Sequence, residues 1–489
     1  MTNYAFRSTG TISATITGPL SAFGEVDVAQ LSPSAQVAFV YALEPQQVLT
    51  RTYLTGASVT AVNGEAVVSS GTATTGYARL TSSQVTKYKP GQGTAARWTA
   101  RFSEGAAGNQ QLAGLSNQEA GYQVGYVNDV FGILYTKSGT LEVQTLTVTV
   151  APAAPGNVSI TLDGSGPVAV AVTASGSTAI CAYEISQGGY GQSSGGWSAQ
   201  ALGNVVYFTR RITGPSTVLS TFAAGGTGTA AAFAVLTAGV TSNTSFIPQA
   251  SWNGTTPTGF DPLKGNVYGV QFQYLGYGDA FFYVEDGTTG RFSLVHTIQN
   301  AGTVTSPVLR NPNLYLTWES RNIGTATSKT LYTASGGSFI EGLIAPPPSK
   351  FAQVVTKTVG AGTETPVLSV RANTVYTNRV SMGQLTMART SVSADGTKPV
   401  EVRLYRNSTL TAAQFAAVDT FSCAGYDQLA TVATGGQLVF AFTVDKTGSD
   451  SQELGTLNIT LQAGEVLTIT AKSANASDVS ATLAWFEDV

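Results

Sequence analysis

Apolar and polar residues alternate with a period of two along most of this chain, most clearly between residues 260 and 300. There, Tyr268, Val270 and Phe272 fall on one face and polar or small residues fall on the other. Such a period indicates half-buried strands, and the glycine-containing breaks between the runs indicate turns. We predict a three-stranded β-meander that needs a second sheet to cover it. The predicted strands are 267–274, 280–284 and 291–298, with turns at 275–278 and 286–290.

The strand pattern continues on both sides of this run and divides the chain into parts. Residues 141–246 have their own supply of apolar residues and interrupt the aromatic-rich pattern around them. Three consecutive prolines in 345–350 predict a stiff spacer, and the length beyond them fits one jelly-roll-like sandwich. The predicted fold class is all-β. Its parts are an N-terminal arm (1–24), a discontinuous β-sandwich (25–140 plus 247–344), an inserted small β-rich domain (141–246), a proline linker (345–350) and a C-terminal β-sandwich (351–489).

Two stretches of the inserted part depart from the plain strand pattern. Residues 177–186 predict a short helix, because Ser177 or Thr178 is a suitable N-cap and apolar residues follow. Residues 222–240 are the nearest approach to a membrane span, but they are rich in alanine, glycine and threonine and too weakly hydrophobic. They predict two short strands around a glycine-rich turn. The N-terminus shows no apolar stretch typical of a signal peptide, so we expect no membrane insertion.

Composition narrows the range of functions. Charged residues make up 11% of the chain, against about 25% in average globular proteins, and the formal net charge is −3. No basic face for nucleic acid is evident. The 54 glycines suit many short strands joined by tight turns. Cys181 and Cys423 lie far apart in the sequence, so we expect both thiols to be free and buried.

Signatures of catalysis and metal binding are absent from the sequence. The single histidine, His296, lies on an alternating strand and is expected in the core or in an interface. Catalytic carboxylate pairs are remote in sequence and stay open as an alternative, with the candidates Asp261, Asp279, Glu285 and Asp286. Turn chemistry already accounts for Asp279 and Asp286. Oxygen ligands for calcium occur in loops only at 128–129 and at Asp261, so we predict no metal and no cofactor.

One loop has a composition that suits recognition. Residues 187–196 are mostly glycine, serine, glutamine and tyrosine, and they end at Trp197. Loops of this kind on a rigid sandwich often carry binding residues. We therefore predict Tyr190 and Trp197 as ligand contacts. The alternative is that Trp197 anchors the end of a flexible loop, as the other four tryptophans are expected to pack in cores.

Several segments resemble structural proteins of tailed phages and of large DNA viruses of aquatic hosts. The resemblance runs through about 95–489 and is most specific in 246–314. The segments that carry it are 100–102, 131–135, 246–253, 261–262, 264–268, 271–278, 295–296, 311–314 and 398–407. The resemblance implies a virion protein of the kind that is often associated with tails or host-recognition fibres. The resemblance implies that the discontinuous sandwich is concanavalin-like (laminin-G-like), and it transfers no functional residue.

The function that the resemblance implies is a non-enzymatic virion protein, a tail-fibre or spike component that recognises host-surface glycans. Its expected partners are other virion proteins, further copies of itself, with a trimer favoured, and host-surface polysaccharide. It would be assembled in the host cytoplasm and exposed on the particle. Two alternatives remain open at this point. One is an architectural capsid-decoration, tail or baseplate protein without a ligand, and the other is a glycan depolymerase with a carboxylate pair in an open groove.

Overall fold

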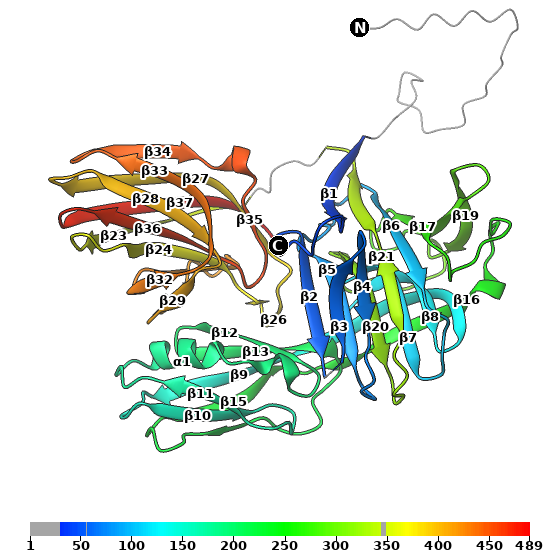
Figure 1. Ribbon diagram of the computed structural model, residues 1–489, viewed down its shortest axis with the longest axis horizontal. Coiled ribbons are helices and arrows are strands. Elements are labelled where there is room, and N and C mark those ends of the chain that lie inside the picture. The colour runs from blue at the N-terminus through cyan, green and yellow to red at the C-terminus, as the bar shows by residue number, and fades with distance from the viewer. Residues whose placement is uncertain (1–29, 55, 344–348) are drawn as a thin grey trace, which may run out of the picture.

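The computed structural model describes residues 30–54, 56–343 and 349–489, and within these ranges the protein is nearly all β with one α-helix. The predicted fold class is confirmed. Figure 1 shows three packed groups of strands: a sandwich on the right, the C-terminal strands at upper left and the inserted segment at lower left. The predicted N-terminal arm (1–24) and the prolines of the linker lie outside the described residues. Ser349, which was expected in the linker, begins β23 (Ser349–Val359).

Two large sheets form the first sandwich, and aromatic side chains from both, such as Trp98 and Trp318, fill the core between them. The first sheet has the order β19 (Arg291–Ile298), β18 (Ala280–Asp286), β17 (Asn266–Phe272), β6 (Thr94–Phe102), β21 (Thr330–Thr333), β4 (Glu65–Ser69) and β3 (Ser58–Val62), with β22 (Ser335–Glu341) and β1 (Leu31–Ala38) joined through β6. The second has the order β12 (Trp197–Leu202), β13 (Val205–Thr213), β9 (Val130–Val150), β8 (Gly121–Val127), β7 (Asn109–Ser116), β20 (Tyr315–Asn322), β5 (Tyr77–Ser82) and β2 (Val48–Tyr53), with β15 (Ala230–Thr237) and β16 (Val240–Pro248) also paired to β9.

The meander predicted from the alternating pattern is confirmed as β17, β18 and β19. Antiparallel pairing joins β17 to β18 and β18 to β19. Tyr268, Val270 and Phe272 are buried, as the period of two requires. The face they share packs into the core of the sandwich. The second sheet covers this face, which explains why the run is so rich in aromatic residues.

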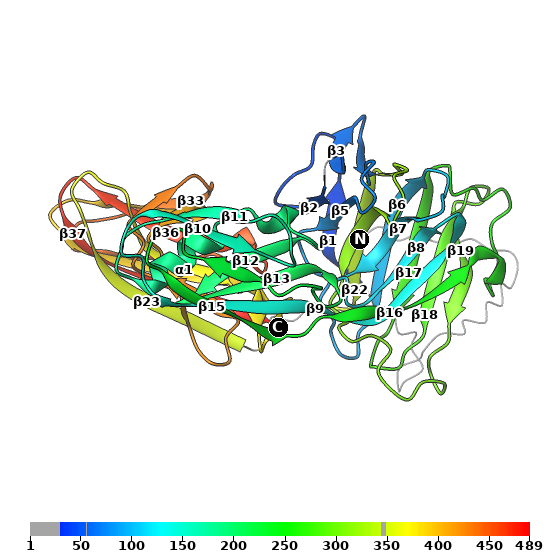
Figure 2. The same cartoon turned by 90° about the horizontal axis from the view of Figure 1, so that it is seen from below.

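The inserted segment is continuous with the second sheet, because one long strand serves both. The first half of β9 pairs with β8 and β16, and its second half pairs with β13 and β15. Figure 2 shows β9 running from the inserted segment into the sandwich. The points where the chain leaves and re-enters the sandwich lie side by side, with Thr140 opposite Val240. The expected boundary at residue 141 therefore falls inside a strand.

The inserted segment closes around its own core, with a small sheet of β11 (Val168–Val172), β10 (Gly156–Thr161) and β14 (Thr221–Ala223) on one side. The predicted helix is confirmed as α1 (Thr178–Ser186), and the Ser177 hydroxyl accepts a hydrogen bond from the Ile180 N–H at 3.3 Å. Residues 222–240 form strand ends and strands, with glycines at positive φ in the turn. No helix of the described residues is long and apolar enough to cross a membrane.

The C-terminal residues form another pair of sheets around a separate core. One sheet is ordered β23, β37 (Ser477–Asp488), β27 (Gln384–Gly396) and β34 (Ser449–Glu453), with β35 (Thr460–Leu461) joined at β27. The other is ordered β30 (Ala416–Ala417), β31 (Ala424–Asp427), β24 (Thr365–Ala372), β36 (Val466–Ser473), β28 (Val400–Arg406) and β33 (Gln437–Val444). Leu410 and Phe415 reach into the core of the inserted segment. The C-terminal sandwich is thus packed against the insertion.

Candidate functional site

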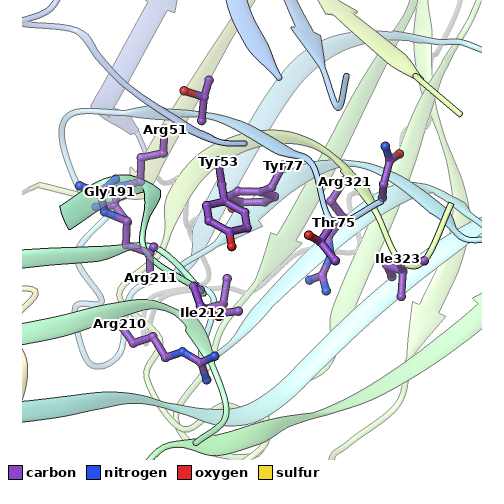
Figure 3. A pocket seen from close by; sticks show the side chains of 16 residues that line it. Arg51, Tyr53, Thr75, Tyr77, Gly191, Arg210, Arg211, Ile212, Arg321 and Ile323 are labelled. Atoms are coloured by element: carbon purple, nitrogen blue, oxygen red, sulfur yellow. The ribbon is translucent and has the colours of Figure 1, made fainter. Parts of the chain in front are cut away.

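A pocket of about 270 Å³ lies where the first sandwich meets the inserted segment. The sandwich contributes β2, the start of β5 and the end of β20. The insertion contributes a glycine-rich loop at 191–196 and the end of β13. Figure 3 shows the tyrosines Tyr53 and Tyr77 in the middle, with arginines on either side. We call this site the arginine pocket.

Cross-strand register builds the sandwich wall of the arginine pocket. Tyr53 of β2 lies opposite Tyr77 of β5, and Tyr77 lies opposite Arg321 of β20. Side chains two residues apart on a strand share a face, so Arg51 lies on the same face as Tyr53. The row formed by Tyr53, Tyr77 and Arg321 therefore presents two aromatic rings and a guanidinium group to the pocket.

The next row of the same face places two arginines opposite each other. Arg51 pairs in register with Arg79, and Arg79 with Glu319. Arg79 has several partners: its guanidinium lies 3.9 Å from Glu319, and Nη2 donates to the Ser116 carbonyl at 3.0 Å and to Thr317 Oγ1 at 3.3 Å. Like charges in opposite positions destabilise a sheet. Arg51 is thus the arginine of this row whose charge has no carboxylate partner.

The insertion wall depends on two glycines and an irregularity in β13. The pairing of β13 with β9 shifts register between residues 209 and 213, and this shift allows the successive residues Arg210 and Arg211 to line the same pocket. Gly195 and Gly196 adopt φ values of +78° and +63°. A Cβ on Gly195 would lie 2.5 Å from Arg210 Nε, so only glycine lets the loop approach this closely.

Gln192 fixes the insertion loop to the sandwich. Its Oε1 accepts a hydrogen bond from the Leu54 N–H at 2.9 Å, and its Nε2 donates to the Thr52 carbonyl at 3.1 Å. The Arg211 N–H donates to the Gly196 carbonyl at 2.8 Å. The loop is therefore held against both β2 and β13, and the two walls keep a defined distance.

Arg210 has a structural role. Its Nη2 lies 2.9 Å from Asp163 Oδ2, in an ion pair that is almost fully buried. Its Nη1 donates to the carbonyls of Gly214 at 2.9 Å and Pro215 at 2.6 Å. Asp163 in turn accepts from the Thr217 N–H at 2.6 Å. This network satisfies the Arg210 charge inside the fold.

Arg51, Arg211 and Arg321 have no such compensation. None of the ion pairs formed within residues 30–54, 56–343 and 349–489 includes them. Burial, followed by the charge of Arg51, lowers the pKa of Arg211 to about 10. Burial, followed by the charge of Arg79, also lowers the pKa of Arg51. The described pocket lining contains no Asp or Glu, and it can donate several hydrogen bonds to an acceptor-rich ligand.

The two residues predicted as ligand contacts, Tyr190 and Trp197, are buried in a core, which contradicts that prediction. Tyr190 is 2% exposed and Trp197 is 0% exposed, and both belong to the core of the inserted segment. The Tyr190 hydroxyl donates to the Ile185 carbonyl at 2.8 Å, and Trp197 Nε1 donates to the Ser194 carbonyl at 2.9 Å. The rings turn inward because an apolar core lies under the loop. The glycine backbone of the same loop is what faces the pocket.

Sequence reasoning found the loop but missed the arginines. The available signal was the dipeptide Arg210–Arg211 in a chain with few charged residues. Arg51 and Arg321 gave no signal, since each is a single polar residue of an alternating strand. Their role depends on strand neighbours that lie far away in the sequence.

The single histidine is buried, as expected. His296 is 6% exposed, and its Nδ1 accepts a hydrogen bond from the Asn253 N–H at 3.2 Å. Burial lowers the pKa of His296 below its ordinary value. The ring is therefore neutral at pH 7 and serves to hold the chain at Asn253.

The candidate carboxylates lie in or beside loops, except Glu285, which lies within β18. Asp286 Oδ1 accepts from the Thr288 N–H at 2.7 Å, which confirms its turn role, whereas Asp279 Oδ1 accepts from the Asn300 N–H at 2.7 Å and joins two separate loops. Asp261 Oδ1 accepts from the Leu263 N–H at 2.9 Å. None of these residues, nor Glu285, belongs to the arginine pocket.

The two cysteines and the possible metal ligands add no further candidate site among the described residues. Cys181 and Cys423 are free and buried, as predicted. Burial raises the pKa of Cys181 to about 11, so the group is a thiol at neutral pH. Within the described part of the chain, no cluster of three His, Cys, Asp or Glu side chains could hold a metal ion. Asn128, one of the loop oxygen candidates, instead uses its Oδ1 to accept from the Gly108 N–H at 2.9 Å.

Comparisons with known proteins give only weak similarities. No family model matches the sequence, and no curated protein matches it. A structure from work on endo-acting O-glycanases of the human gut microbiota aligns with 64% of this chain and 100% of its own, at 9% identity and a TM-score of 0.28. An alginate lyase mutant in complex with alginate tetrasaccharide covers 64% and 98%, at 9% identity and a TM-score of 0.19.

A third similar structure comes from an archaeal virus with a triple jelly-roll fold. It covers 95% of this chain and 98% of its own, at 6% identity and a TM-score of 0.17. The weakly similar proteins thus include viral jelly-roll proteins and glycan-active β-sandwich proteins. At these scores the similarity supports no conclusion about function, which has to come from the arginine pocket itself.

Proposed function

We propose that this protein is a non-enzymatic virion structural protein, a tail-fibre or spike component, that recognises host-surface glycans through the arginine pocket. The observation that carries the proposal is the pocket wall on which Tyr53, Tyr77 and Arg321 stand in one cross-strand row beside Arg51. Aromatic rings pack against the C–H faces of sugars, and guanidinium groups donate to their oxygens. The glycine-rich loop at 191–196 adds backbone groups on the other side.

The overall build supports a particle component. Few residues are charged, and three separate hydrophobic cores stabilise the described part of the chain. The inserted segment and the C-terminal sandwich share one of these cores. Parts that pack this closely resist local opening, which suits a protein exposed on the outside of a particle.

An architectural role without a ligand is the second candidate. Exposed apolar side chains favour it, since Tyr41 is 97% exposed and Phe421 is 78% exposed. Such residues often mark contacts with partner proteins or further copies of the chain. Under this alternative the protein binds virion partners only, and the arginine pocket has no ligand.

The test measures binding of the full-length protein to immobilised surface polysaccharide from candidate host cells. We expect saturable binding that Arg211→Met abolishes and Arg291→Met leaves intact, because Arg291 is an exposed arginine outside the pocket. The full chain is required, since removing the C-terminal sandwich would uncover the core at Phe415. No release of reducing sugar ends is expected. Equal polysaccharide binding by both variants would place the glycan site outside the arginine pocket, and binding to virion partners alone would favour the architectural role.

A further inference from the structure

The arginine pocket concentrates positive charge in a chain that is otherwise sparsely charged and slightly acidic. The 489 residues include 25 Lys and Arg, and the formal net charge is −3. Four arginines nevertheless line this one pocket: Arg51, Arg210, Arg211 and Arg321. Asp163 compensates Arg210. Three guanidinium groups therefore line a site of small volume without a negative partner among the described residues.

The sheet register shows why the fold itself does not supply that partner to Arg51. Glu319 is the carboxylate of this row, and it lies next to Arg79, on the far side from Arg51. Arg79 also donates to a backbone carbonyl, at Ser116. One carboxylate thus serves two opposed arginines, and the repulsion between Arg51 and Arg79 is only partly offset. A negative group inside the pocket would complete the row.

On the opposite wall of the pocket, Arg211 has free donors that could bind the same negative group. Its Nε is buried without a hydrogen-bond partner, as are Nε of Arg79 and Arg210, but Arg211 alone of the three also makes no hydrogen bond to the described residues through Nη1 or Nη2. A Cβ on Gly191 would lie 3.0 Å from Arg211 Nη1, so glycine at 191 keeps the space beside the guanidinium open. Figure 3 shows the side chains of Arg51 and Arg211 close together at the end of the pocket next to Gly191. Two guanidinium groups in this arrangement match the paired oxygens of a carboxylate or a sulfate.

The rest of the pocket has a different character. Tyr53 and Tyr77 occupy its middle, and Arg321 and Ile323 stand at the opposite end from Arg51 (Figure 3). A simple inorganic anion would leave these rings without a contact. A ring with apolar C–H groups, joined to an anionic substituent, would use both halves of the site.

We infer that the arginine pocket binds an acidic saccharide, in which a carboxylate or a sulfate ester lies between Arg51 and Arg211 and the sugar ring packs beside Tyr53. This inference rests on the proposed glycan-recognition function and names its ligand class. The pocket volume of about 270 Å³ is close to the lower end of the roughly 300–1,000 Å³ typical of small-molecule sites. We therefore assign to the pocket a single acidic residue of a longer glycan.

The test compares matched sugars by ligand-observed NMR titration of the full-length protein. Each pair differs only in charge: methyl uronides against methyl hexosides of gluco, galacto and manno configuration, N-acetylneuraminate against its methyl ester, and galactose 6-sulfate against galactose. We expect at least one acidic member to bind roughly tenfold or more tightly than its neutral twin. The uronide and sulfate arms separate the two sources of the anionic group. Raising the salt concentration should weaken this binding.

Variants identify the arginines involved. Arg211→Met and Arg51→Met should each weaken binding of the acidic sugar roughly tenfold or more, whereas Arg291→Met should leave it unchanged. Arg211→Lys should retain part of the affinity, since it keeps the charge and loses the fork. Thermal unfolding of every variant checks that the fold is intact.

Each other outcome counts against the inference. Equal binding of both members of every pair would overturn the acidic class but leave glycan recognition by the pocket in place. Inorganic sulfate that binds as tightly as the acidic sugars would overturn the role of the sugar ring. Absence of binding in every arm would overturn the inference, and the immobilised-polysaccharide experiment would then decide separately whether the proposed function survives.

Discussion

Two junctions of the first sandwich differ in the partners that they offer to their cations. Towards the C-terminal sandwich, Lys89 lies 2.6 Å from Asp488, and Arg379 lies 3.1 Å from Glu119. Lys87 Nζ donates to the Met382 carbonyl across the same junction. Towards the inserted segment, Arg51 and Arg211 face a pocket without a carboxylate among its described lining residues.

The difference separates charges that hold the molecule together from charges kept for a ligand. A buried charge is costly unless it is paired or hydrogen-bonded, and at the junction that only joins two parts each of these cations finds a carboxylate or a carbonyl acceptor inside the fold. A binding site keeps its donors free and carries the cost until the ligand arrives. Arg210 and Arg211 make the contrast most sharply, since they are neighbours in the chain and only Arg210 has a partner.

The largest expected loss of stability comes from removing the partner of the paired arginine, Arg210. Asp163→Ala leaves Arg210 buried without its counter-charge and should lower the free energy of unfolding by about 3–5 kcal/mol. Chemical denaturation measures the change. Glu453→Ala is the control, because its ion pair with Arg389 is exposed, and a change within about 0.5 kcal/mol is expected there. A stable Asp163→Ala protein would show that Arg210 finds other compensation.

The buried Lys87 predicts a pH dependence at the C-terminal junction. Burial lowers the pKa of Lys87 from 10.5 to about 8. Between these values the unfolded chain holds a proton that the folded chain has lost, so stability rises with pH through this window and is lower below pH 8. The free energy of unfolding of wild type, relative to Lys87→Met, should rise by roughly 1.4 kcal/mol per pH unit, up to about 3 kcal/mol.

Lys87→Met is the control for groups other than Lys87 that titrate in the same pH range. Tyrosines and Cys181 also titrate at high pH, but they contribute equally to wild type and Lys87→Met and cancel in the difference, and replacing Cys423, whose charge acts on Lys87, by Ala in both proteins removes the remaining thiol. Denaturation curves recorded between pH 7 and pH 10.5 provide the values. A difference that stays flat over this range would mean that Lys87 keeps its ordinary pKa and reaches solvent.

Tyr190 tests the corrected role of the insertion loop. Tyr190→Phe removes the hydroxyl that donates to the Ile185 carbonyl at 2.8 Å, and it should cost about 1 kcal/mol of stability. Binding of polysaccharide by the folded variant should stay unchanged, because the ring lies in the core. Loss of binding with full stability would restore Tyr190 as a ligand contact.

The smallest expected change in stability belongs to the uncompensated arginine. Arg211→Met removes a charge that has no partner in the described fold, so the free energy of unfolding should stay within about 0.5 kcal/mol of wild type or rise slightly. Arg210→Met, one residue earlier, should be clearly destabilised because it breaks the buried network around Asp163. Equal losses in both variants would remove the distinction between the paired Arg210 and the uncompensated Arg211.

The sequence by itself determined the local elements of this protein. The alternation at 267–274 correctly predicted β17, and the breaks after it correctly predicted the turns of the meander. Ser177 correctly predicted the start of α1. Strand period, turn residues and helix caps act over a few neighbouring residues, so one sequence suffices to find them. The burial of both thiols followed in the same way from residue type and composition.

Only the tertiary structure decided where the arginine pocket lies and which arginines are free in it. Arg51, Tyr77, Arg211 and Arg321 come from four distant segments, and long-range strand register brings them together. No local pattern states which strand lies beside which, or on which side of Arg79 the carboxylate of Glu319 falls. The same holds for Tyr190, whose direction depends on the core beneath its loop. Pairing and burial decide whether a charge stabilises the fold or waits for a ligand, and both arise only when distant strands meet.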